Sequence, residues 1–121
     1  MKYMLLIYSD PSAWEGVDEA ASATIMGEYF AFSQSIVESG EMVAGDPLQG
    51  LDTAHTVTVR GGSTIVTDGP FAETKEVLGG YYIVDVVSAD RAHELAAQIP
   101  DARTGKIEVR PTVRVRDNAG L

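Results

Sequence analysis

A carboxylate beside a fixed turn is the strongest chemical signal in this sequence. Asp68 ends a predicted strand within TDGPFAETKE, residues 67–76, and Gly69-Pro70 restricts the backbone that follows it. A carboxylate held in this way can serve as a general acid or base, so Asp68 is the first candidate for a catalytic residue. The alternative is that Asp68 only caps the turn. Phe71 is expected to anchor the turn to the core.

Other charged and titratable side chains lie near this turn in the sequence. Glu73, Lys75 and Glu76 place both signs of charge within four residues, which would orient a polar ligand or simply solvate an exposed loop. His55 begins a predicted strand and is a weaker catalytic candidate, because an imidazole exchanges protons near neutral pH. That role requires a fold that brings His55 close to Asp68.

Two tyrosines are candidates for ligand binding. Tyr29 falls within an apolar helical pattern, and Tyr8 ends the first predicted strand. Each hydroxyl could point into a pocket and donate a hydrogen bond to a ligand. Each ring could equally pack in the core with its hydroxyl satisfied by the protein.

Several functional classes find no support in the composition and motifs. There is no cysteine, and the two histidines lack any metal-ligand spacing, so neither a thiol nor a metal site is expected. The glycine pairs do not open a helix as in a phosphate loop, and no cofactor is expected. A formal net charge of −9 argues against direct nucleic-acid binding. No apolar run suits a signal peptide or a membrane span, so a cytoplasmic location without membrane contact is expected.

The periodicity predicts a single α+β domain over residues 1–115 with a C-terminal tail at 116–121. Helices are expected at 24–37, where two adjacent rows of mostly apolar residues form one broad stripe, and at 89–99, after the cap residue Ser88. The predicted strands cover 2–8, 41–44, 56–60, 63–67, 81–87 and 107–115, and Gly61-Gly62 forms the hairpin turn. Pro111 interrupts the last of them, as suits an edge strand or a bulge. This order is the ferredoxin-like βαβ-βαβ layout with an extra β-hairpin.

Strands 2–8 and 81–87 are apolar on both faces, although two helices can cover only one face of a sheet. A second copy of the chain presenting the same face is the simplest cover. The sequence therefore predicts a homodimer with the form of a dimeric α+β barrel.

The motif TDGPFAETKE, followed by LGGYYIVDV, closely resembles the signature of the DGPF branch of the YCII-related proteins. The opening MKYMLLIYSD and the segment ESGEMVAGDPL fit the same branch, and the resemblance extends from residue 1 to about 115. It implies a ferredoxin-like subunit in a dimeric α+β barrel. Better-studied members resemble small-molecule enzymes that use a His and an Asp in a cleft. The position of that His, counted back from Gly40, holds Tyr29 here.

Two functions are therefore expected as alternatives. In the first, the dimer binds a small organic metabolite and catalyses proton transfer, isomerisation or elimination. The second is a non-enzymatic regulatory module, because proteins resembling this branch are often encoded beside extracytoplasmic-function sigma factors. In that case the partner would be a protein of the sigma factor system.

Overall fold

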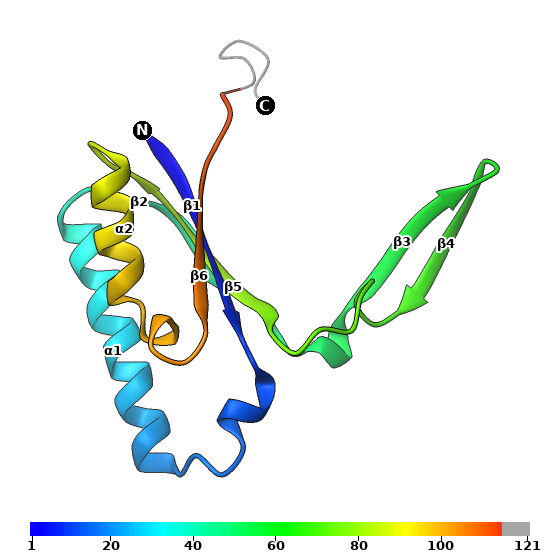
Figure 1. Ribbon diagram of the computed structural model, residues 1–121, viewed down its shortest axis with the longest axis horizontal. Coiled ribbons are helices and arrows are strands. Elements are labelled where there is room, and N and C mark those ends of the chain that lie inside the picture. The colour runs from blue at the N-terminus through cyan, green and yellow to red at the C-terminus, as the bar shows by residue number, and fades with distance from the viewer. Residues whose placement is uncertain (115–121) are drawn as a thin grey trace.

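The computed structural model describes residues 1–114, which form a four-stranded antiparallel sheet, two helices and a separate two-stranded hairpin (Figure 1). The strands are β1 (Lys2–Ser9), β2 (Met42–Pro47), β3 (His55–Arg60), β4 (Ser63–Asp68), β5 (Val77–Asp85) and β6 (Lys106–Pro111). The helices are α1 (Glu19–Glu38) and α2 (Ala89–Gln98), with short 3₁₀ turns η1 (Pro11–Trp14), η2 (Leu51–Thr53) and η3 (Pro100–Ala102). The tail expected at 116–121 lies outside the described residues.

The main sheet has the strand order β2-β5-β1-β6, and every neighbouring pair is antiparallel. Both helices lie on the same face of this sheet (Figure 1). With β3 and β4 set aside, this order and the two crossovers are compatible with a ferredoxin-like fold. The mixed α+β class predicted from the sequence is confirmed.

Local sequence signals explain where the helices begin and end. The side chain of Asp18 accepts a hydrogen bond from the backbone N–H of Ala21, so α1 begins earlier than the apolar pattern predicts. Gly40 has a φ of 80°, a conformation that glycine adopts without strain, and the chain turns there into β2. Ser88 caps α2 by accepting from the N–H of Arg91, as predicted.

The core lies between the helices and one face of the sheet. Its best-buried side chains come from β1, α1, β5, α2 and the cap residue after α2, and they include Leu5, Ile36, Val84, Leu95 and Ile99. The Phe32 ring packs edge-on against Tyr82, with centroids 5.1 Å apart. Burial alternates strictly along β1, so Tyr3, Leu5 and Ile7 face the helices.

The other face of the sheet carries no element of the described chain (Figure 1). Met4 stands opposite Ile83 and Leu6 opposite Tyr81 in the β1–β5 register, and all four side chains are only half-buried. We call this surface, together with Tyr8, the bare face. Its apolar character follows from the strand residues that the sequence showed to be apolar on both sides.

One part of the predicted α1 stripe was wrong. The first row supplies the buried Phe32 and Ile36, but Met26, Phe30 and Val37 of the second row are each more than 60 % exposed. The second row lies on the side of α1 that faces away from the buried core, so only the first row reaches it.

An ion pair joins α2 to the start of β2. Arg91 donates from Nε and Nη2 to the two carboxylate oxygens of Glu41, both at 2.9 Å, and Ser39 also donates to Glu41. These hydrogen bonds hold the pKa of Glu41 below its ordinary value. Because the folded-state pKa is lowered, the stabilisation is present above the unfolded value near 4.5 and is lost as the pH falls.

We expect Arg91→Met to be less stable than the wild type at pH 7, with a gap that closes as Glu41 becomes protonated in acid. Urea unfolding at neutral and acidic pH measures both quantities. Arg60→Met is the control, because Arg60 donates only to its neighbour's carbonyl, that of Val59. A gap of equal size at both pH values would show that Arg91 stabilises by packing instead.

Candidate functional site

An apolar cavity of about 600 Å³ opens between α1 and the end of the sheet. Helix α1 forms one wall, the β2 and β5 strand ends form the opposite wall, and Trp14 of η1 closes one side. The lining residues are Ile7, Ser9, Trp14, Met26, Tyr29, Phe30, Ser33, Met42, Gly45, Asp46, Pro47, Gly79, Gly80, Tyr81, Tyr82 and Asp101.

One face of α1 forms the wall of this cavity. It combines the exposed Met26 and Phe30 with the half-buried Tyr29 and Ser33, which lie one turn apart on the helix. Tyr29 also packs against the core, so this wall continues the core surface into a space large enough for a small organic molecule. The sequence showed the stripe but not the difference between its two rows.

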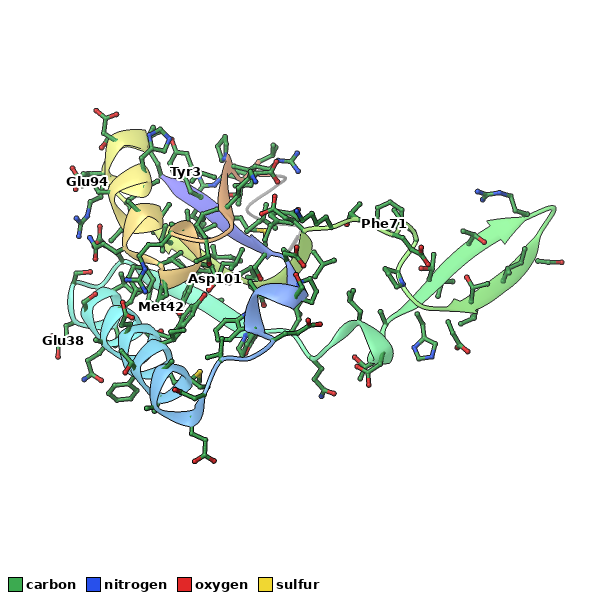
Figure 2. The ribbon with its side chains drawn as sticks, turned by 60° about the horizontal axis from the view of Figure 1, so that its bottom comes forward. Tyr3, Glu38, Met42, Phe71, Glu94 and Asp101 are labelled. Atoms are coloured by element: carbon green, nitrogen blue, oxygen red, sulfur yellow. The ribbon has the colours of Figure 1, made fainter. Side chains whose placement is uncertain are left out.

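A buried carboxylate lies in the cavity wall. Asp101, in the 3₁₀ turn after α2, is 8 % exposed, and its Oδ1 accepts a hydrogen bond of 2.7 Å from the Tyr29 hydroxyl. Figure 2 shows Asp101 within the body of the protein, beside the helices. A buried carboxylate requires a donor, and Tyr29 supplies it.

The environment of Tyr29 keeps its hydroxyl protonated. Burial raises the pKa of the phenol well above its usual value, and the hydrogen bond to Asp101 raises it further. Tyr29 is therefore a hydrogen-bond donor at neutral pH and not a base. Of the two partners, Asp101 is the one that can accept a proton or bind an N–H or O–H group of a ligand.

Sequence reasoning missed Asp101. The segment IPDART reads as the end of a helix, and Asp101 lies 72 residues from its partner. No spacing rule connects two such positions, because the β1-α1-β2 and β5-α2-β6 halves of the fold bring them together. A buried hydroxyl at Tyr29 needing an acceptor was the one available signal.

A second polar contact joins α1 to β5 across the cavity lining. Ser33 Oγ and the Tyr82 hydroxyl are 2.8 Å apart and share a hydrogen bond. The charged residues of the lining are Asp46 and Asp101, and this lining includes no Lys, Arg or His. Asp46 is exposed and its carboxylate accepts from the Tyr81 hydroxyl, so the acidic character of this apolar cavity comes from Asp101.

Of the two predicted ligand-binding tyrosines, only Tyr29 lines the cavity. Tyr8 follows Ile7 on β1 and stands opposite Lys106 in the register, on the bare face of the sheet. Strand alternation explains the difference, since neighbouring residues point to opposite faces.

Asp68 and His55 come together, as a catalytic role for His55 would require. His55 Nε2 lies 3.4 Å from Asp68 Oδ1, and the two residues are opposite each other at the base of the hairpin. Both are exposed, Asp68 completely, and neither belongs to the cavity lining of the chain. The hairpin extends away from the two helices and the main sheet (Figure 1).

The remaining members of the motif also lie outside the cavity lining. Glu73 and Lys75 are exposed, and Glu76 forms an ion pair with Lys106 of β6. The expectation that Phe71 anchors the turn to the core was wrong, because its ring is 91 % exposed and extends into solvent (Figure 2).

Among residues 1–114, no three His, Cys, Asp or Glu side chains are grouped as a metal ion would require. Neither described helix is both long and apolar enough to cross a bilayer. The site is thus a set of aromatic and small side chains around one buried Tyr–Asp pair.

The geometry defines a small α+β domain with a lateral cavity between its first helix and an antiparallel sheet. The chain belongs to the YCII-related family, whose domain model matches residues 1–116. It is also similar to an uncharacterized protein of Rhizobium meliloti (strain 1021), with 37 % identity over 113 residues, covering 92 % of this chain and 91 % of the relative. Family membership predicted from the TDGPFAETKE segment is confirmed.

Proposed function

We propose that the protein binds a small organic metabolite in the cavity between α1 and the sheet. The observation that carries this proposal is a buried carboxylate, Asp101, held by Tyr29 in the wall of an otherwise apolar space of about 600 Å³. Small-molecule binding sites are typically concave and mostly apolar, and they contain a small number of polar groups. The aromatic walls favour a ligand with a flat apolar body.

The charge of the cavity restricts the ligand further. The buried charged residue of the lining, Asp101, is acidic, and an anionic ligand would find no cation among the lining residues. A neutral or cationic ligand that donates a hydrogen bond to Asp101 fits this arrangement, because a buried carboxylate gains most from a donor.

Proton transfer, isomerisation or elimination is the reaction class that this pair could support. In a single chain Asp101, and not the predicted Asp68, is positioned to exchange a proton with a bound molecule, while the protonated Tyr29 hydroxyl orients it. The active protein in this proposal is a cytoplasmic homodimer whose subunits cover each other's bare face. The half-buried Met4, Leu6, Tyr81 and Ile83 supply the apolar surface for that contact.

The regulatory alternative draws on a different observation. The membership of the DGPF branch implied by TDGPFAETKE, with its link to sigma factor systems, favours a protein partner, and the exposed hairpin offers a surface for one. The ligand experiment below separates the two functions.

Three phenyl compounds that differ in charge test the cavity: 2-phenylethylamine, 2-phenylethanol and phenylacetate. Trp14 is the single tryptophan of the chain and lines the cavity, so its fluorescence reports on binding. We expect the amine and the alcohol to change this fluorescence and raise the unfolding midpoint, and phenylacetate to do neither.

Asp101→Asn should weaken amine binding by about tenfold, since it removes the charge of the acceptor while keeping its shape. Asp68→Asn is the matched control and should bind like the wild type. If none of the compounds binds, or if Asp68→Asn loses as much as Asp101→Asn, the cavity assignment is wrong and a search for a protein partner becomes the better course.

A further inference from the structure

The β3–β4 hairpin, residues 55–68, is an arm without support from the rest of the described chain. Its strands pair only with each other and form a sheet separate from the main one. Gly61 and Gly62, both with positive φ, make its tight turn. A two-stranded hairpin alone is at best marginally stable in water, so a further surface is needed to hold this arm.

The two faces of the arm differ in chemistry. Val57 stands directly opposite Val66, and Val59 stands opposite Thr64, so these residues share one face. The three valines are 60 %, 60 % and 59 % exposed. The opposite face presents mainly threonine hydroxyls, with Ile65 as its large apolar side chain. We call the first surface the valine face.

The arm and the bare face lie on the same side of the molecule. Figure 1 shows α1 and α2 on one side of the main sheet and the arm extending from the other. Each arm strand has six residues, about 20 Å of extended chain. The four strands of the main sheet span about 14 Å between the outer two. The arm is therefore long enough to extend across a sheet that covers the bare face.

The valine face would enlarge a contact made by the bare face. The strands of the bare face are six to nine residues long, which gives a flat, projected area of about 400 Å² before the relief of the side chains is counted. A stable interface typically buries roughly 800 Å² of accessible surface per partner. The arm carries a further unpartnered apolar surface on the same side of the described chain, and it would add to that buried area.

We infer that the valine face of each arm packs against a second copy of this chain, next to the sheet-to-sheet contact. This inference rests on the homodimer of the proposed function. It also includes the His55–Asp68 pair in the interface, because both residues lie on the valine face at the base of the arm. Asp68 then contributes to subunit contact and not to the cavity of its own chain.

Two neighbouring residues of β4 provide a matched test. The chain has no cysteine, so Val66→Cys and Ile65→Cys each introduce a single thiol, one on each face of the arm. Reaction with Ellman's reagent is followed in the dimer, with urea-unfolded protein as the reference. We expect the thiol of Val66→Cys to react about tenfold more slowly than that of Ile65→Cys in the dimer, after correction for their unfolded rates.

A second pair of variants tests the effect of each arm face on the monomer–dimer equilibrium. Val66→Asp should shift the monomer–dimer equilibrium about tenfold towards monomer, and Ile65→Asp should leave it nearly unchanged, because only the first places a charge in the interface. Circular dichroism should match the wild type in both, since neither residue belongs to the core.

The failures are distinguishable. Equal thiol reactivity at both positions in a protein that light scattering shows to be dimeric overturns the role of the arm and leaves the sheet-to-sheet dimer. A monomer at every concentration overturns the homodimer, and the role of the arm with it. The phenyl compounds test the cavity independently of either result.

Discussion

Replacing Gly105 with alanine is expected to lower the free energy of unfolding by about 3 kcal/mol. A Cβ at this position would overlap the carbonyl oxygen of Tyr8 and press on the Cα of Ser9 at the end of β1. Both are backbone atoms of β1, so neither can rotate away as a side chain would. The backbone must move, and with it the turn whose Gly105 N–H donates to the Asp101 carbonyl.

Gly27→Ala is the matched control for this substitution. Gly27 lies within α1 with no heavy atom near the position of an added Cβ, so alanine should stabilise the protein by about 0.5–1 kcal/mol. Urea unfolding of the two variants gives the comparison. A loss below about 1 kcal/mol for Gly105→Ala would mean that the turn after α2 is free to move away from β1.

Tyr29→Phe should destabilise the protein by about 1–3 kcal/mol at pH 7, because it leaves a buried carboxylate without its donor. Asp101 is 8 % exposed, and Tyr29 provides the side-chain hydrogen bond it accepts. Tyr81→Phe is the control, since the Tyr81 hydroxyl donates over 3.3 Å to the exposed Asp46. Tyr81→Phe should lower the free energy of unfolding by less than about 0.5 kcal/mol.

The same substitution has a signature in alkaline solution. The folded-state pKa of Tyr29 is raised above the unfolded value of about 10, so its contribution is intact below that pH and is lost as the pH rises beyond it. Wild type should therefore lose stability above about pH 10 more steeply than Tyr29→Phe. Unfolding midpoints of both proteins, measured below and above this pH, show the difference. If the midpoints of the two proteins fell in parallel with pH, the buried, protonated Tyr29 hydroxyl would be contradicted.

Local signals in the sequence predicted most of the elements. The hairpin turn at Gly61-Gly62 and the stripe of α2 follow from residues close to one another, so short-range rules were sufficient. Strand ends were less accurate: β6 ends at Pro111, whereas extension to residue 115 was predicted. The partner strand β1 begins at Lys2, whose carbonyl accepts a hydrogen bond from the N–H of Thr112, so β6 has no further strand residue to pair with.

The cavity was harder to predict than the fold. Tyr29 was identified, but its partner comes from a turn in the other half of the fold and carries no motif. The conspicuous TDGPFAETKE segment drew attention to Asp68, whose placement on an extended arm depends on the length of the β2–β5 connection. The residues of a turn determine the local direction of the chain. They do not determine how far the turn lies from the cavity.

The strand order also determines when this protein can fold during synthesis. Strand β1 leaves the ribosome first, yet it is central and pairs with β5 and β6, which are made last. Strand β1 therefore remains unpaired, with its apolar side chains exposed, until nearly all of the described chain has emerged. Pairing with strands that are distant in the sequence slows folding and prolongs the exposure of aggregation-prone apolar surface. Nascent chains of this protein should consequently rely on chaperones more than their small size suggests.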